Sequence, residues 1–385
     1  MTITEVRPEH GGTRIDEARR DAFVERLFGA LLGGSELLAV EVGRRLGLYE
    51  AIRGHDAGST PRDVGGRTGV VERYAREWLE QQAASGVLDV VADSPDGRER
   101  RYALDEAHAV VLLDPDDPAA FGAGGMLLLG LAQALPAVVE AYRTGRGVGY
   151  AAYGEGLRDG LAAFNRPVFA NDVPGWVDAL GDVGARLRRD GGQVLDLGCG
   201  TGRSSVALAR ALPLATVDAV DLDAASVATA EQVVAEAGLG GRVRVRRGDA
   251  TDDGASGGGP YDLVAVLEAL HDMAHPVAAL RSVRERLADG GCVLVADEKV
   301  AEEFVAPADE AERLQYMFSA LHCLPSTVDE LPAGAVEVEH PEDGVAHGTV
   351  LREPTMRDWA ARAGFGRVET LEVENDFWRF YRLDG

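Results

Sequence analysis

Three alternate glycines stand between a short apolar run and a helical pattern near the middle of the chain. The apolar run covers residues 194–197, the glycines are Gly198, Gly200 and Gly202, and the helical pattern covers residues 204–212. The run is typical of a buried parallel strand. Glycine at a strand-to-helix turn lets the backbone lie against a ligand, because a Cβ would block the approach. The turn therefore predicts a cofactor site, and the spacing must decide between two common cofactors.

The spacing after the second glycine argues against a dinucleotide. A dinucleotide site carries its third glycine three positions after the second, and Arg203 stands there instead. The pattern D-x-G-x-G-x-G over residues 196–202 resembles motif I of class I S-adenosylmethionine (SAM) methyltransferases. The resemblance implies that SAM binds at this turn and leaves as S-adenosylhomocysteine (SAH). It assigns cofactor contacts to Asp196, Gly198, Cys199 and Gly200.

The segments that follow have the order of the same methyltransferase core. A second apolar run, residues 215–222, carries an aspartate near its end, where a carboxylate can accept hydrogen bonds from both ribose hydroxyls. A third run ends at residues 248–250, the position where this family holds the adenine. The alternative is an α/β domain whose glycines only make turns. The cofactor residues that the resemblance adds are Asp221, Leu222, Gly248, Asp249, Ala250 and Leu267.

Two histidines are candidate catalytic residues. His271 follows the fourth apolar run, and its unperturbed pKa of roughly 6.5 suits deprotonation of a phenol. Its H-D-M context looks like the base position of the family, and Asp272 is a candidate to orient it. The second candidate is His322, in the segment L-H-C-L-P. Each histidine has a structural alternative, because His271 can cap the strand or pack on the cofactor and His322 can form part of the pocket wall.

The predicted fold class is α/β, with a Rossmann-like, seven-stranded class I methyltransferase core over residues 188–385. An insertion at about residues 301–352 interrupts the alternation of strands and helices, and the last two strands form a hairpin. Ligands of an open doubly wound sheet bind at the carboxyl ends of its strands. We therefore expect one crevice to gather Asp221, Asp249, residues 268–271 and residues 297–299.

The N-terminal part predicts a mainly helical winged-helix module. Residues 1–18 are expected to be a flexible tail, and the module covers residues 19–113, with two helices over residues 21–52 that break near Gly33 and Gly34. Acidic residues outnumber basic ones in the module, which argues against DNA binding. The module resembles the winged-helix-like domain of small-molecule O-methyltransferases, which implies that it dimerises and covers the substrate. The arginines that would support DNA binding are Arg67, Arg73 and Arg76.

A helical connector over residues 114–187 is expected to contribute to the substrate pocket. Its most apolar part, residues 123–142, contains Gln133, Pro136 and three glycines, which favours a buried helix pair over a membrane span. The N-terminus lacks the apolar core of a signal peptide. The three cysteines show no metal spacing and suit a reducing compartment. These features predict a cytoplasmic protein with no membrane contact and no metal.

The charge of the chain bears on its partners. The formal net charge is −25, which argues against nucleic acid as a partner, because affinity for phosphates comes from accumulated positive charge. The resemblance to methyltransferases implies a small molecule as the substrate.

Beyond the tail, the whole chain resembles actinobacterial-type SAM-dependent methyltransferases with an N-terminal winged-helix domain. The resemblance extends to N-R-P-x-F at residues 165–169 and to a Y-x-x-x-x-L-H-C-L-P segment at residues 316–325. It implies methylation of a small aromatic or polycyclic, natural-product-like acceptor, most readily at oxygen, by a homodimer. Carbon or nitrogen methylation is the runner-up. A regulator that senses SAM and a SAM-dependent enzyme that does not methylate are the other classes.

Overall fold

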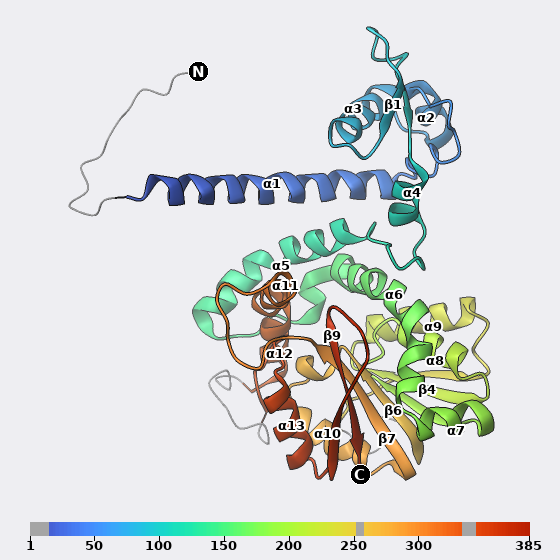
Figure 1. Cartoon of the computed structure of the whole chain (residues 1–385), viewed down its shortest axis with the longest axis vertical. Helices are drawn as coiled ribbons and strands as arrows, with labels where there is room; N and C mark the ends of the chain where they lie inside the picture. Colours follow the sequence, from blue (N-terminus) through green and yellow to red (C-terminus); the bar gives the residue numbers. More distant parts are fainter. Residues whose placement is uncertain (1–14, 252–257, 333–343) are drawn as a thin grey trace.

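The computed structural model describes residues 15–251, 258–332 and 344–385. A helical N-terminal domain stands above an α/β domain, and a long helix, α1, lies between them (Figure 1). The expected tail falls on residues 1–18, of which residues 1–14 lie outside the described residues. Asp16 caps α1 and the helix begins at Glu17, so the last residues of the expected tail are helical.

The N-terminal domain has the predicted winged-helix order. Thr60 caps the second helix in a reciprocal capping box with Asp63, and Pro61 occupies the first turn. The core of this domain includes Tyr49, Trp78 and Tyr102. Its elements are α1 (Glu17–Arg45), α2 (Pro61–Thr68), α3 (Glu72–Ala84), β1 (Asp89–Ala92), β2 (Arg101–Ala103) and α4 (Glu106–Leu113).

The prediction of a helix break near Gly33 and Gly34 is wrong, because α1 runs without interruption to Arg45. Tertiary packing overrides the low helix propensity of glycine here. Helix α5 packs along α1, and a Cβ on Gly125 of α5 would lie 2.5 Å from the carbonyl oxygen of Leu37. Glycine in α5 therefore allows the close approach that holds α1.

The connector consists of α5 (Gly124–Thr144), the 3-10 turn η1 (Tyr150–Tyr153), α6 (Gly154–Ala179) and α7 (Asp182–Asp190). The expected helix pair is wrong, because α5 is a single helix with Pro136 inside it. Among the described residues, α5 alone is long and apolar enough to cross a membrane. It packs between α1 and α6, and a Cβ on Gly130 would lie 2.5 Å from the backbone nitrogen of Leu157. These contacts are those of a packed helix.

The C-terminal domain is built on one seven-stranded sheet with the order β5-β4-β3-β6-β7-β9-β8. Strands β3 to β7 are parallel to one another, and β9 runs antiparallel to both β7 and β8. The predicted α/β fold class and the final hairpin are therefore confirmed. The strands are β3 (Gly192–Leu197), β4 (Ala215–Asp221), β5 (Val243–Arg247), β6 (Tyr261–Leu267), β7 (Leu287–Glu298), β8 (Arg367–Leu371) and β9 (Trp378–Asp384).

Helices cover both faces of the sheet. One buried cluster joins the sheet to α6, α7, α8 (Arg203–Ala211) and α9 (Ala224–Glu236). A second joins the opposite face to α10 (Pro276–Arg284) and α13 (Glu353–Arg362). Neighbouring residues of β3 divide between the two clusters, which explains why the central strands read as continuous apolar runs.

The insertion adds three helical segments beside the carboxyl ends of the strands. They are α11 (Glu310–Phe318), the π-helical turn η3 (Ser319–Cys323) and α12 (Leu324–Glu330). The valine- and glutamate-rich stretch at residues 333–343 lies outside the described residues. The boundaries drawn between tail, module, connector and core remain predictions.

Candidate active site

A cavity of about 780 Å³ opens at the carboxyl ends of β3, β4, β6 and β7. The chain progresses from β3 outward to β5 and then returns to place β6 beside β3. This reversal is the topological switch point where doubly wound sheets bind ligands. Helix α6 and the segments η3 and α12 also contribute to the cavity wall. Residues from three separate parts of the sequence therefore surround one site.

The glycine turn directly follows β3 and forms part of the cavity wall. All three glycines have positive φ, at 75° for Gly198, 51° for Gly200 and 77° for Gly202. A Cβ on Gly198 would lie 2.5 Å from Cβ of Ala269, and one on Gly202 would lie 3.0 Å from Cβ of Ala230. A Cβ on Gly200 would meet open space. The view that all three glycines make room for a ligand is therefore corrected, because Gly198 and Gly202 make room for the protein and Gly200 faces the cavity.

Asp221 ties the end of β4 to this turn. Its Oδ2 accepts a hydrogen bond from the backbone nitrogen of Gly200 at 2.8 Å, and its Oδ1 accepts one from that of Asp223 at 2.9 Å. Burial raises the pKa of Asp221. The carboxylate lies on the cavity wall beside an open glycine. This arrangement fits a ribose and a backbone-contacting nucleoside.

Most of the predicted site residues line this cavity, and Asp196 does not. Its predicted contact with the cofactor stays a prediction. Asp196 is 1% exposed and accepts hydrogen bonds from the hydroxyls of Ser204, at 2.7 Å, and Ser205. Burial raises the pKa of Asp196 to about 6. The cavity is lined by Gly198, Cys199, Gly200, Asp221, Leu222, Gly248, Asp249, Ala250, Leu267, His271 and His322.

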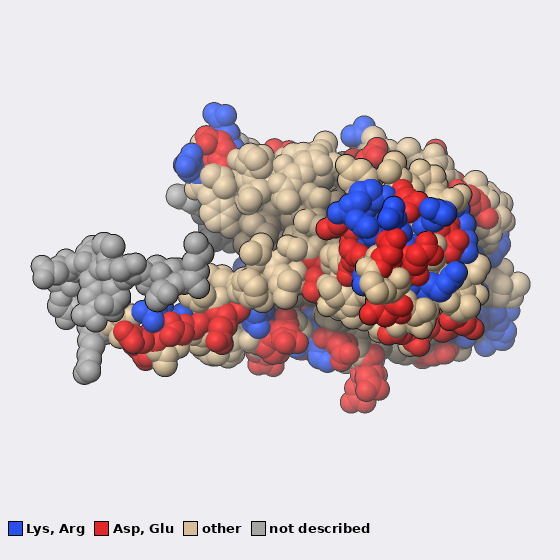
Figure 2. Space-filling view, turned by 90° about the horizontal axis from the view of Figure 1, so that it is seen from above, with Lys and Arg blue, Asp and Glu red and all other residues tan. Residues whose placement is uncertain are grey.

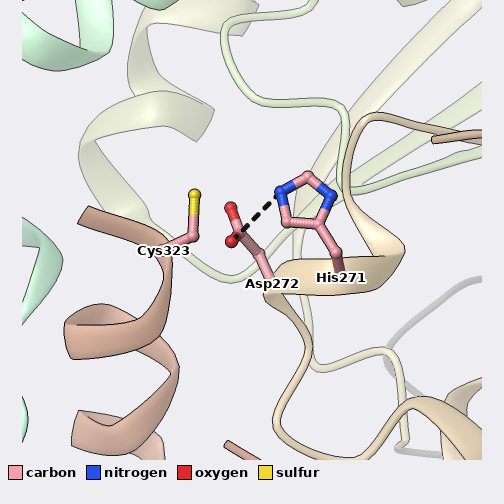
Figure 3. Close-up of side chains that lie close together, drawn as sticks. All are labelled: His271, Asp272 and Cys323. Atoms are coloured by element: carbon pink, nitrogen blue, oxygen red, sulfur yellow. Dashed lines mark ion pairs between the residues drawn. The ribbon is translucent and has the colours of Figure 1, made fainter. Parts of the chain in front are cut away.

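His271 lies in the 3-10 turn η2 (Leu270–Asp272) and is 3% exposed. Its Nδ1 is 2.9 Å from Oδ1 of Asp297, at the end of β7, and its Nε2 is 3.3 Å from Oδ1 of Asp272. Figure 3 shows the second of these pairs. Burial lowers the pKa of His271, but the carboxylates of Asp297 and Asp272 outweigh burial and raise the pKa well above its usual value. The unperturbed pKa assumed from the sequence is therefore replaced by a raised one.

Cys323 completes a small cluster with His271 and Asp272 (Figure 3). One potential ligand atom from each lies within 4.8 Å of the others, which is a spacing that could hold a metal ion. Burial raises the pKa of the Cys323 thiol to about 12. Metals bind the thiolate, so this environment works against a metal at the cluster. The absence of a metal stays a prediction.

His322, the second candidate, is 2% exposed and packs edge-on against two tyrosine rings. The ring centroids lie 5.4 Å from Tyr150 and 4.7 Å from Tyr153. Its Nδ1 is 3.4 Å from the sulfur of Cys323, and its buried Nε2 has no hydrogen-bond partner among the described residues. Burial lowers the pKa of His322. The His322 side chain is therefore a neutral imidazole in an aromatic part of the cavity wall.

Two glutamates meet behind His271. Asn165 of α6 donates a hydrogen bond to Glu268, whose backbone φ of 56° is unusual for a residue other than glycine. The carboxyl group of Glu268 lies within hydrogen-bonding reach of that of Glu298. Burial raises the pKa of Glu268 to about 7, and burial together with repulsion from Glu268 raises that of Glu298 well above its usual range. The sequence places both glutamates at strand ends and so predicts that they share one crevice. It does not predict that their carboxyl groups are in contact.

Two protein-family models match parts of the chain that correspond to the two observed domains. A methyltransferase-domain model matches residues 194–291, and the model of a Rv2258c-like winged helix-turn-helix domain matches residues 34–113. The chain therefore contains a methyltransferase domain and an N-terminal Rv2258c-like winged helix-turn-helix domain. The first match begins on β3 and ends in β7. It therefore includes the glycine turn, Asp221 and His271.

Individual proteins are similar to this chain over part or nearly all of its length. The ubiquinone biosynthesis O-methyltransferase of Caulobacter sp. (strain K31) is 38% identical over 120 residues, which cover 29% of this chain and 46% of that protein. The chain thus spans less than half the length of this curated relative. Mitomycin 7-O-methyltransferase MmcR is 19% identical with a TM-score of 0.63, covering 96% of this chain and 99% of that one. Human N-acetylserotonin methyltransferase in complex with SAM is 16% identical with a TM-score of 0.66, covering 97% and 99%. The structural matches show a shared fold over almost the whole chain.

Proposed function

We propose that this methyltransferase transfers a methyl group from SAM to a hydroxyl group of a small aromatic or polycyclic, natural-product-like molecule. The observation that carries the proposal is one cavity with the open Gly200 and the Asp221 carboxylate near the histidine–aspartate pair His271–Asp297. The names of MmcR and the Caulobacter relative support oxygen as the acceptor atom. Carbon or nitrogen methylation of a similar molecule is the alternative.

The residues around the glycine turn would hold the cofactor. Asp221 would accept the ribose hydroxyls, the backbone at Gly200 would lie against the nucleoside, and residues 248–250 would border the adenine. Bound SAM supplies an electrophilic methyl group. The wall formed by α6, η3 and α12 would position the acceptor and exclude water. Such positioning can lower a barrier by about 7–11 kcal/mol.

His271 would take the proton of the acceptor hydroxyl. Asp297 holds Nδ1, which leaves Nε2 as the nitrogen that can accept a proton. Asp272 lies at 3.3 Å from Nε2 and would have to yield that position to the acceptor. Because the two carboxylates raise the pKa of His271, the neutral form that acts as a base increases as the pH rises.

The Asp297→Asn variant tests this role through pH dependence. For the wild type we expect kcat/KM to rise with pH through an ionisation above about 6.5, as the imidazolium loses its proton. Removing the Asp297 charge lowers the pKa of His271, so the rising limb should move to lower pH while the maximal rate falls. Steady-state profiles of both proteins measure the shift. An unmoved limb would show that the titrating group is not His271.

Methyl transfer itself is tested with methyl-labelled SAM and a panel of phenols, aromatic amines and enolisable carbonyl compounds. We expect SAH and labelled product with phenols, and NMR of the product identifies the methylated atom. Label on carbon or nitrogen would select the alternative. SAM binding without SAH formation from any acceptor would favour a non-methylating enzyme.

The winged-helix domain would cover the substrate and join two subunits, without binding nucleic acid. Two of its three candidate DNA-binding arginines are engaged within the protein. Arg73 pairs with Glu77 at 2.5 Å, and Arg67 donates to the carbonyl of Ala51 and the hydroxyl of Ser59. Acidic and basic side chains are interspersed on this domain in Figure 2. These observations support a role other than regulation of DNA.

Homodimerisation and a cytoplasmic location are further parts of the proposal. The first half of α1 carries an exposed apolar stripe. A second copy can pack its own stripe there across a two-fold axis. The three cysteines are free and buried, as suits a reducing compartment. The stripe consists of Phe23, Val24, Leu27, Phe28, Leu31 and Leu32.

A charge placed in this stripe should separate the subunits. We expect wild-type protein to elute as a dimer and the Phe23→Asp/Phe28→Asp variant as a monomer at micromolar concentration, because two buried carboxylates per chain oppose the apolar contact. Size-exclusion chromatography with light scattering measures the mass. The matched control is Ala22→Asp, on the opposite side of the helix, which should remain dimeric. A monomeric wild type would contradict the proposed dimer.

A further inference from the structure

The contact between Glu268 and Glu298 is not explained by methyl transfer to a hydroxyl. Glu298 is 2% exposed, and its buried Oε2 has no hydrogen-bond partner among the described residues although the side chain lines the cavity. A buried acceptor without a partner is destabilising, and more so when the group is charged. Two carboxyl groups in contact accommodate their charge by sharing a proton. The pair is therefore a preformed acceptor for a positive group.

The groups that face the pair leave its charge uncompensated. Asn165 donates to Glu268 but is neutral. His271 and Asp297 are the charged groups that act on both glutamates. The positive charge of His271 is itself paired with Asp297 and Asp272. Carboxyl side chains also outnumber the two arginines on the cavity wall, Arg158 and Arg203.

Two aromatic rings border the same part of the cavity. Phe169 follows Asn165 by one turn of α6, so both lie on one face of the helix. Trp378 of β9 is the ladder partner of Glu298 in β7. The two rings stack with centroids 5.7 Å apart, and both contribute to the wall. Aromatic faces beside carboxylates form a favourable setting for an ammonium group.

We propose that Glu268 and Glu298 bind a protonated amine of the acceptor. The inference rests on the proposed function and names its substrate class: an aromatic molecule with a hydroxyl that reaches His271 and an ammonium that reaches the glutamate pair. The ammonium donates hydrogen bonds to both carboxylates, including the unpartnered Oε2 of Glu298. It replaces the shared proton, which is released to solvent, so the charge of the site balances.

The test compares two ligands that differ in charge and match in shape. Isothermal titration calorimetry measures the affinity of SAH-saturated protein for tyramine and for 4-propylphenol, its neutral counterpart. We expect tyramine to bind at least about tenfold more tightly, because a hydrogen bond to a charged group is worth about 1.5–3 kcal/mol. Titrations in buffers of different ionisation enthalpy should show proton release with tyramine alone.

Substitutions of the two glutamates test whether they cause the preference for tyramine over 4-propylphenol. Glu298→Gln and Glu268→Gln should each remove most of the preference for tyramine while binding of 4-propylphenol and SAH stays unchanged. The matched control is Glu330→Gln, which removes a carboxylate from another part of the same wall and should keep the preference. Equal affinities of the wild type for both ligands, including no measurable binding of either, overturn the inference, as does a preference that survives in Glu298→Gln. Failure of SAH to bind would instead overturn the proposed function.

Discussion

Replacement of His271 by alanine is expected to lower kcat by about 10²–10⁴-fold and to leave the affinity for SAM nearly unchanged. General-base catalysis contributes a factor of this size when the nucleophile keeps its proton at the working pH. His271 stands at the cavity wall with Asp297 fixed on Nδ1, so its removal deletes the proton acceptor and leaves the glycine turn intact. Single-turnover kinetics at saturating SAM measure the rate, and calorimetry measures the affinity.

The control for this prediction is the neighbouring histidine. His322 is also buried in the wall, but its contacts are aromatic rings and Cys323 in place of carboxylates. His322→Phe preserves an aromatic ring and should reduce kcat by less than about tenfold. Unchanged turnover in His271→Ala would return that residue to a packing role. A larger loss in His322→Phe than in His271→Ala would reverse the assignment.

The second large effect is expected at the cofactor. Asp221→Ala should weaken binding of SAH by about 10²-fold or more, because two hydrogen bonds to a charged group are lost, each worth about 1.5–3 kcal/mol. The substitution also releases the backbone nitrogen of Gly200, which Asp221 holds at 2.8 Å. Calorimetry of the variant measures the loss. At saturating SAM, kcat should change far less than the affinity.

Asp218→Asn separates loss of the cofactor contact from loss of stability. Asp218 is a buried acid of the same strand, β4, and it accepts the hydroxyl of Tyr261 at 2.9 Å, away from the residues that line the cavity. Its substitution should lower the melting temperature and leave SAH affinity unchanged. Wild-type affinity in Asp221→Ala would place the ribose elsewhere.

Local signals of the sequence were sufficient to predict the sheet and the winged helix. The apolar run before Gly198, the acid at the end of β4 and the order of the later strands each depend on a few neighbouring residues. The helix boundaries near Gly33 and Pro136 could not be predicted in the same way. At these positions, packing between α1, α5 and α6 compensates for poor helix formers, and such packing depends on residues far apart in the chain.

The location of the site could be predicted from the sequence, but the contacts between its residues could not. The carboxyl ends of the strands identified the crevice, and most of the predicted site residues line it. The pairing of His271 with Asp297 joins residues 26 positions apart, and the raised pKa of the histidine follows from that pairing. The roles of Gly198 and Asp196 depend on atoms of α8 and of the turn after β6. Sequence spacing carries no information on these contacts.

A crystal structure of the protein with SAH tests the central claim most directly. We expect the ribose hydroxyls within hydrogen-bonding distance of the Asp221 carboxylate, the nucleoside against the backbone at Gly200, and the sulfur facing the part of the cavity where His271 lies. Density for SAH elsewhere, or a ribose far from Asp221, would contradict the account.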